Sequence, residues 1–347
     1  MVPIQKRHIW ISSFESYRLN LYTYFRPRNQ FMKLVIAFFR LIRWPNLIFI
    51  AVTQALYYYA IIEPLTKKGI GISFNIDLFP WLCLASLLIA AAGYIINDYF
   101  DLNIDQVNKP GRLVIDKIIK RRWAMAFHLM MSFIAVLTGI YIDIRSGSWW
   151  VGLSNLACAL LLFGYSVTLK KKLLIGNVLI SALTGWVIVV AFLCIYNKGF
   201  YCKDCDTRLI NAYTNRFIRI TFLYVAFAFI ISLIREVIKD MEDMEGDAKY
   251  GCKTMPIVWG IPATKVFTAV WIIVLTGVLG IVQFYVLQFG WWWSSVYCLA
   301  LIISPLLWIL FKLYKAQVPK DYRLLSAAVK FVMFTGIMSM LFFKIYS

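Results

Sequence analysis

Nine long apolar runs restrict this chain to a membrane-spanning helical fold. Each run is about 20 residues long, the length that an α-helix needs to cross the hydrocarbon core of a bilayer. Hydrophobic residues make up 61% of the 347-residue sequence and charged residues 15%, a composition that excludes an ordinary soluble protein. We therefore predict an all-α, polytopic membrane protein. Its nine predicted transmembrane helices are residues 45–63, 79–97, 123–142, 149–168, 174–196, 217–235, 264–287, 292–313 and 325–343.

The chain before the first run is of two kinds. Residues 1–30 are polar, basic and aromatic, and they contain no apolar core of the length found in a cleavable signal peptide. The stretch from Phe31 to Trp44 is apolar but includes three cations, so we expect an amphipathic helix on the membrane surface. The predicted domains are a basic N-terminal tail, residues 1–30, and a transmembrane domain, residues 31–347.

The distribution of positive charge predicts the orientation. The formal net charge is +19, but the lysines and arginines lie in short loops between apolar runs, as in membrane proteins and not as in nucleic-acid-binding proteins. With the N-terminus inside, the inside segments hold 26 of the 36 lysines and arginines, and the outside segments hold 9. We therefore predict a multi-pass protein of a bacterial or archaeal cell membrane, with the N-terminus in the cytoplasm and the C-terminus outside.

Acidic side chains are concentrated in two stretches of this pattern. Nine of the 17 aspartates and glutamates lie there, and each stretch begins where an apolar run ends. Each holds three aspartates at positions i, i+3 and i+7, which on one helix fall within an arc of roughly 60°. Both triplets fall on the predicted cytoplasmic side. They are Asp98, Asp101 and Asp105 and, later in the chain, Asp240, Asp243 and Asp247.

Two facing carboxylate clusters suit a hard divalent cation, above all Mg²⁺ shared with a phosphate-bearing substrate. Basic side chains near the clusters would hold phosphate oxygens, although the cytoplasmic bias of positive charge accounts equally well for Lys171 and Lys172. The nearby cations are Lys109, Arg112, Lys170, Lys171, Lys172, Arg235, Lys239 and Lys253.

Two other interpretations are open at this point. The acidic stretches could be solvated loops, although unrelated loops rarely repeat one spacing. A cation transporter would instead place carboxylates within the spans, near the bilayer midplane, and the predicted spans hold almost none. Cys202 and Cys205 form a lone CxxC pair in a predicted outside loop, which cannot complete a zinc site.

Both acidic stretches resemble signatures of the UbiA superfamily of intramembrane prenyltransferases. The first signature is matched by Asn97-Asp98-Tyr99-Phe100-Asp101-x-x-x-Asp105-x-x-Asn108-Lys109-Pro110-x-Arg112. The second is matched by residues 235–247 together with Gly251-Cys252-Lys253-Thr254-Met255-Pro256. The sequence of this second stretch is most similar to the digeranylgeranylglyceryl phosphate synthase branch. Two shorter family elements are resembled by Arg43-Trp44-Pro45-Asn46 and Tyr165-Ser166-x-x-Leu169-Lys170.

The resemblance implies nine transmembrane helices around a central cavity, which the aspartate motifs cap from the cytoplasm. It implies a prenyl diphosphate bound through Mg²⁺, with all six aspartates as metal ligands and with Asp98, Asp101, Asp240 and Asp243 as the catalytic ones. One departure concerns residues 113–117, Leu-Val-Ile-Asp-Lys, where this branch usually has Pro-x-Pro-Ser-Gly. The expected substrate-binding residues are Asn46, Asn97, Arg112, Tyr165, Lys170, Arg235, Lys239 and Lys253.

The predicted function is Mg²⁺-dependent transfer of a polyprenyl group, of the geranylgeranyl type, from its diphosphate to a lipid-soluble acceptor. A prenylated glycerol phosphate is favoured as acceptor because the cytoplasmic pole carries more cations than one diphosphate needs. An aromatic acceptor of the 4-hydroxybenzoate, homogentisate or naphthoate type is the alternative. The expected partners are the prenyl diphosphate, the acceptor and membrane lipid, with no nucleic acid and no obligate protein partner.

Overall fold

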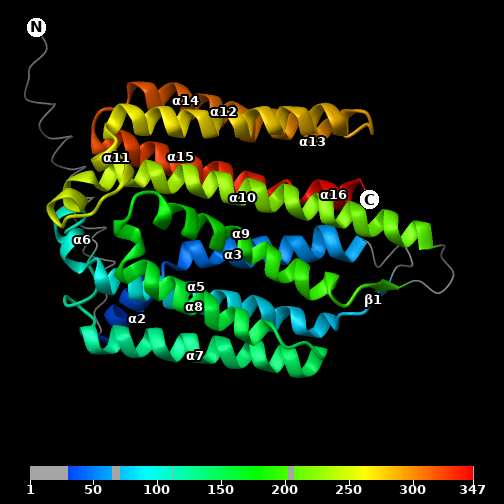
Figure 1. The fold of residues 1–347 in the computed structure, drawn as a ribbon, viewed down its shortest axis with the longest axis horizontal. Coiled ribbons are helices and arrows are strands. Elements are labelled where there is room, and N and C mark those ends of the chain that lie inside the picture. Colours follow the sequence, from blue (N-terminus) through cyan, green and yellow to red (C-terminus); the bar gives the residue numbers. More distant parts are fainter. Residues whose placement is uncertain (1–29, 65–70, 112, 202–206, 347) are drawn as a thin grey trace, which may run out of the picture.

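The computed structural model describes residues 30–64, 71–111, 113–201 and 207–346. Nearly all of these residues are helical, and the long helices run roughly side by side in Figure 1. One small antiparallel pair joins β1, Gly71–Ile72, to β2, Phe200–Tyr201. The predicted all-α class is confirmed.

Within the described residues, eight helical segments are long and apolar enough to cross a membrane. The predicted span 149–168 corresponds to α8, Val151–Val167, whose 17 residues lie at the short end of the range for a spanning helix. The count of nine is therefore not confirmed, although every predicted span is helical. The eight segments are α3 with η1 (Trp44–Leu56, Tyr57–Ile62), η2 with α5 (Ile76–Leu78, Phe79–Phe100), α7 (Arg121–Ser146), α9 (Ile175–Tyr196), α10 (Thr207–Lys249), α12 (Gly260–Leu287), α13 with η4 and α14 (Trp292–Cys298, Leu299–Ile303, Ser304–Lys315), and α15 with α16 (Pro319–Met338, Leu341–Ile345).

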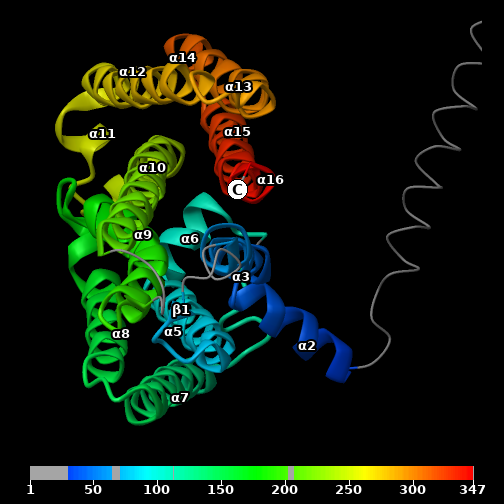
Figure 2. The ribbon, with the colours of Figure 1, turned by 90° about the vertical axis from the view of Figure 1, so that its right-hand side faces the viewer.

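Four short or peripheral helices complete the described chain, and two of them mark one end of the bundle. α6 and α11 lie at that end, whereas β1 and the C-terminus lie at the opposite end (Figure 1). Viewed along the helices in Figure 2, α7 lies at one edge with α5 and α8 both beside it, α9 and α10 come next, and α12, α14 and α15 lie towards the opposite edge. The four elements are α2 (Gln30–Leu41), α6 (Leu102–Asn108), η3 (Leu169–Lys171) and α11 (Met255–Val258).

A contact between α7 and α8 fixes the start of α8. The carboxylate of Asp143, near the end of α7, accepts hydrogen bonds from the backbone N–H groups of Val151 and Gly152 at 3.1 and 2.8 Å. These are unpaired donors at the start of α8, so Asp143 fixes where that helix begins. A Cβ on Gly139 would lie 2.8 Å from the Cα of Gly152, so glycine allows the two backbones to approach.

The loop at residues 113–119 contains the stretch 113–117 whose sequence was unusual, and its apolar side chains pack in the interior. Val114, Ile115 and Ile119 are buried in one cluster with Leu41, the last residue of α2, and with Ile42, which follows it. α2 confirms the predicted helix before the first span, and it projects away from the bundle in Figure 2. Its location on the membrane surface stays a prediction, as does the basic tail, which at residues 1–29 lies outside the described chain.

Candidate active site

The two aspartate triplets meet at the α6 end of the bundle, but the first is not on one continuous helix as predicted. α5 ends at Phe100 and α6 begins at Leu102, with Asp101 between them at φ −85° and ψ 1°. Backbone hydrogen bonds from Asp101 to Asn97 and from Asp105 to Asp101 (2.9 and 2.8 Å) continue the helical pattern across this break. The direction of the chain therefore changes within the triplet, while the spacing of its side chains is largely kept.

The second triplet lies on a single uninterrupted helix. α10 has 43 residues, so it is about 65 Å long, roughly twice the thickness of a bilayer core. The acidic stretch, which follows the predicted span at 217–235, is thus a rigid continuation of that span and not a loop. This continuation holds Asp240, Asp243 and Asp247 in a fixed relation to α6.

Side chains of the first motif bridge directly to the second. Lys109 Nζ lies 2.6 Å from Asp243 Oδ2. Asn108 donates through Nδ2 to the backbone oxygen of Asp243 at 2.9 Å and accepts through Oδ1 from the backbone N–H of Gly246 at 2.9 Å. Asp247 also lies within electrostatic range of Asp101. The expectation that both clusters meet at one pole is confirmed.

The bridge requires glycine at position 246, which gives a testable expectation. A Cβ there would lie 2.5 Å from the Asn108 amide, closer than real Cβ contacts allow. We expect Gly246→Ala to lower the free energy of unfolding by about 1–3 kcal/mol and to reduce turnover. The matched control is Gly277→Ala in α12, where a Cβ would meet nothing within 4 Å. Equal unfolding midpoints for the two variants in detergent would contradict the requirement for glycine at position 246.

Most of the six aspartates already have a polar partner. Asp98 Oδ1 lies 2.6 Å from Arg43 Nη2. Asp101 accepts from Asn97 Nδ2 at 2.7 Å and forms an ion pair with Lys170. Asp240 accepts from Asn177 Nδ2 at 2.7 Å. Among the described residues, Asp105 and Asp247 form no ion pair.

The charge balance at this pole suits a divalent cation. Burial, followed by the negative charges of Asp101 and Asp98, raises the pKa of Asp105 from 3.8 to about 6. This shift reflects negative charge held at a desolvated position, which a cation would neutralise. Carboxylate oxygens are the ligands that Mg²⁺ prefers. Within the described chain, no three acidic, cysteine or histidine side chains already converge as a metal site, so some of the present ion pairs would open when a metal binds.

A cavity of about 240 Å³ lies next to the aspartates, between α3, α5, α8, α9, α10 and α15. The central cavity expected from the sequence is therefore present. It extends along α5 from Asn97, at the motif end of that helix, to Ser86, which lies eleven residues, ~16 Å, away. The deep lining is mainly apolar and includes Ile50, Ile89, Leu183, Trp186, Val187 and Val190.

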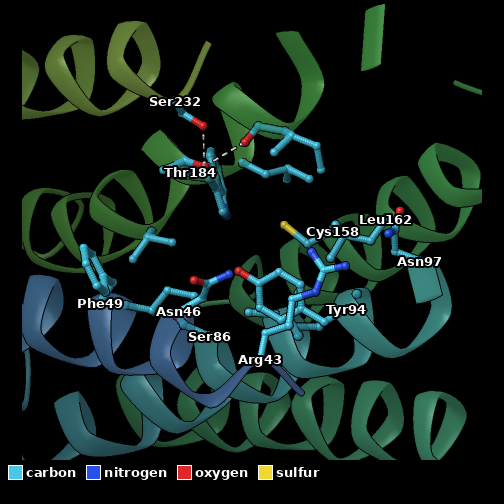
Figure 3. Close-up of a pocket in the computed structure, with 18 of the residues that line it drawn as sticks. Arg43, Asn46, Phe49, Ser86, Tyr94, Asn97, Cys158, Leu162, Thr184 and Ser232 are labelled. Carbon is cyan, nitrogen blue, oxygen red and sulfur yellow. Dashed lines mark hydrogen bonds between the residues drawn. The ribbon is translucent and has the colours of Figure 1, made fainter. Parts of the chain in front are cut away.

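Figure 3 shows the polar part of the cavity. Arg43 and Asn46 project from the α3 side, Tyr94 lies beside Arg43, and Thr184 and Ser232 are joined across the opposite wall by a 3.2 Å hydrogen bond. The Arg43 guanidinium carbon lies 5.2 Å from the centre of the Tyr94 ring. One cation thus contacts an aromatic face and, through Asp98, the first aspartate motif.

Five of the eight expected substrate-binding residues line the cavity, and a sixth lies at the motifs. That sixth residue is Lys170, paired with Asp101. Lys253 is not brought to the cavity: its side chain is exposed, and its backbone N–H donates to the Lys171 carbonyl at 2.8 Å. Arg112 lies outside the described residues, as do Cys202 and Cys205. The five lining residues are Asn46, Asn97, Tyr165, Arg235 and Lys239.

Sequence reasoning did not assign three charged residues that line the cavity. Glu236 is 9% exposed and lies 2.6 Å from Arg235 Nη1 and 3.3 Å from Lys239 Nζ. Arg43 adopts a left-handed backbone conformation (φ 51°) just before α3 begins, which is uncommon for a non-glycine residue and often marks a functional site. Lys330 is the lone cation within the last predicted span, and a charge within a membrane helix is itself a functional signal.

Comparison with known proteins agrees with this geometry. The UbiA prenyltransferase family matches residues 69–336. The digeranylgeranylglyceryl phosphate synthase of Methanosphaera stadtmanae is 29% identical over 253 residues, which cover 72% of this chain and 80% of that protein. Matches to three further archaeal proteins of that name cover 53–62% of their length.

Solved structures share the fold. A digeranylgeranylglyceryl phosphate synthase structure superposes with a TM-score of 0.57 at 21% identity and covers 89% of this chain and 99% of that one. A UbiA homologue from Archaeoglobus fulgidus, bound to GPP and Mg²⁺, gives a TM-score of 0.51 at 13% identity, covering 88% and 99%. Because the family match spans most of the sequence, together with the paired aspartate motifs and the cavity between them, this chain belongs to the UbiA prenyltransferase family.

Proposed function

We propose that this protein transfers a polyprenyl group, of the geranylgeranyl type, from its diphosphate to the hydroxyl of a prenylated glycerol phosphate. The observation that carries the choice of acceptor is the charge of the cavity. Of the described residues that line it, four are cationic and one is anionic. The named relatives are digeranylgeranylglyceryl phosphate synthases, which supports the same choice. The cations are Arg43, Arg235, Lys239 and Lys330, and the anion is Glu236.

The diphosphate group is assigned to the aspartate motifs at the cavity mouth. All six aspartates are proposed to hold Mg²⁺, which when bound supplies positive charge to the departing diphosphate. Asn97, Lys170 and Arg112 are proposed to bind diphosphate oxygens. Lys109, which pairs with Asp243 in this structure, is proposed to bind the diphosphate as well when that ion pair opens. The motif end of the cavity is thus assigned to charge and its deeper part to the apolar chain.

Bond cleavage and bond formation follow from this division. The allylic carbon–oxygen bond breaks, and the diphosphate leaves with the electron pair, stabilised by the cations at the mouth. The allylic cation is held against the apolar lining, where little water can reach it. The acceptor hydroxyl oxygen then bonds to the allylic carbon, and its proton passes to the departing diphosphate or to water at the mouth. A transporter function is set aside because the chain belongs to a prenyltransferase family.

The acceptor can be tested with purified protein in lipid nanodiscs. Geranylgeranyl diphosphate and Mg²⁺ are supplied with one acceptor at a time: geranylgeranylglyceryl phosphate, 4-hydroxybenzoate, homogentisate or dihydroxynaphthoate. Mass spectrometry of the products is expected to show an ether formed with the glycerol phosphate and none of the aromatic products. Product from an aromatic acceptor alone would overturn the ether-lipid assignment and leave prenyl transfer itself standing.

We also propose that the aspartate pole faces the cytoplasm, on the basis of the 26:9 charge ratio. Asn103 in α6 and Asn197 at the end of α9 are both exposed and lie towards opposite ends of the bundle. In a variant without accessible native cysteines, Asn197→Cys should react with a membrane-impermeant maleimide on intact cells, and Asn103→Cys should react only after lysis. Labelling of both from the same side would contradict this topology.

A further inference from the structure

One cation in the cavity, Lys330, forms no ion pair with any of the described residues. Lys330 lies near the middle of α15 and lines the cavity together with Met333, one turn further along the helix. A lysine at such a position in a membrane helix carries a large desolvation cost, and such residues face a polar cavity or a partner. Its presence in the lining therefore calls for a ligand or an ion-pair partner.

The described chain supplies little to balance this charge. No carboxylate of the described residues forms an ion pair with Lys330. Its Nζ lies 3.4 Å from Asn46 Oδ1, near the outer limit of a hydrogen bond. Most of the charges within electrostatic range of Lys330 are also positive. They are Arg235, Lys239 and Arg43, and the negative charge is Glu236.

Arg235 adds a second unmet requirement at the same place. Its Nη1 is paired with Glu236 at 2.6 Å, but its Nε is buried without a hydrogen-bond partner among the described residues. Glu236 is shared between Arg235 and Lys239, so it cannot neutralise both of them and Lys330. A buried donor and a buried excess of positive charge are both satisfied by an anion.

This cationic group is separate from the one assigned to the diphosphate. Lys109 and Lys170 are held by Asp243 and Asp101 at the motifs. Lys330 lies instead on the α3–α15 wall, hydrogen-bonded to Asn46. Two anionic groups can therefore bind next to one another without sharing the same side chains.

We propose that Lys330 and Arg235 bind the phosphate of the acceptor and thereby select an anionic acceptor. This inference rests on the proposed function. In a glycerol phosphate lipid, two carbon atoms lie between the phosphate-bearing oxygen and the neighbouring hydroxyl. Fixing the phosphate at Lys330 therefore restricts that hydroxyl to the space beside the motifs, where the allylic carbon is generated.

Steady-state kinetics of Lys330→Met test the assignment. The KM for geranylgeranylglyceryl phosphate is expected to rise roughly 10- to 100-fold, the loss typical of a hydrogen bond to a charged group. The KM for geranylgeranyl diphosphate should stay within about twofold of the wild-type value, because other cations hold that group. Lys330→Arg, which keeps the positive charge, should keep the KM for geranylgeranylglyceryl phosphate close to the wild-type value. Lys320→Met, which removes an exposed charge from the same helix, is the matched control and should behave as wild type.

A dephosphorylated acceptor, geranylgeranylglycerol, distinguishes phosphate binding from a merely structural role of Lys330. A structural role would lower the activity with both acceptors alike and would leave the preference between them unchanged. Wild-type protein should prefer the phosphorylated acceptor, whereas Lys330→Met and Lys330→Gln should lose most of that preference, with the remainder due to Arg235. An unchanged preference in folded Lys330→Met and Lys330→Gln would overturn the inference while leaving the proposed function intact. Failure of the wild-type protein to use any glycerol phosphate would instead overturn the proposed function, and the inference with it.

Discussion

Asp98→Asn and Asp243→Asn should each lower kcat roughly 10²- to 10³-fold, the scale expected when one group that stabilises transition-state charge is removed. Asparagine keeps the shape of aspartate but removes the negative charge that would hold Mg²⁺. It also leaves a cation without its partner, which is Arg43 for Asp98 and Lys109 for Asp243. Turnover of geranylgeranyl diphosphate in nanodiscs measures the effect.

The matched control for both variants is Asp116→Asn. Asp116 is an exposed acidic residue at φ 65°, a conformation that asparagine adopts readily, so activity and the unfolding midpoint should stay at wild-type levels. The two motif variants should also keep their unfolding midpoints within a few degrees. Full turnover in either motif variant would remove the proposed metal role at that position.

Removing divalent cations should abolish activity altogether. Without a cation, the six aspartates would repel both one another and the incoming diphosphate. We expect chelation to reduce prenyl transfer to the background rate, and addition of Mg²⁺ or Mn²⁺ to restore it. Turnover that persists after exhaustive chelation would contradict a metal-dependent mechanism.

The same experiment carries a pH dependence. The pKa of Asp105 is about 6 because of burial and the neighbouring Asp101 and Asp98. Above pH 6 this carboxyl is ionised and free to bind a cation, and below pH 6 a proton competes for it. The Mg²⁺ concentration for half-maximal activity should therefore be higher at pH 5.5 than at pH 7.5. A requirement that does not change over this interval would show that Asp105 does not contribute to metal binding.

The sequence alone was sufficient for the fold class and for the position of the aspartate motifs. Apolar runs of membrane length depend only on local composition, and each predicted span is helical in the structure. The i, i+3, i+7 spacing likewise indicated which carboxylates share a face. The break at Asp101 was missed, because the helical hydrogen bonds continue across it and no glycine or proline marks it.

The composition of the cavity could not be predicted in the same way. Arg43 precedes α3, Glu236 lies in α10 and Lys330 lies in α15. Only tertiary packing brings these three residues together. The sequence argument for an anionic acceptor relied on seven cations at the cytoplasmic pole. Three of them, Lys171, Lys172 and Lys253, are exposed, whereas Arg235 and Lys239 line the cavity. The conclusion therefore depends partly on other residues, because Arg43 and Lys330 add positive charge to the cavity and the three exposed lysines do not.

The most direct test of the central claim is to locate the metal and the prenyl chain in one crystal. The protein would be crystallised with Mn²⁺ and an unreactive geranylgeranyl thiodiphosphate, and manganese would be identified by its anomalous scattering. We expect manganese between the two aspartate triplets, in contact with carboxylates of both, and the prenyl chain along the lining that includes Ile89 and Val187. Manganese bound away from both triplets, or a prenyl chain outside this cavity, would contradict the account.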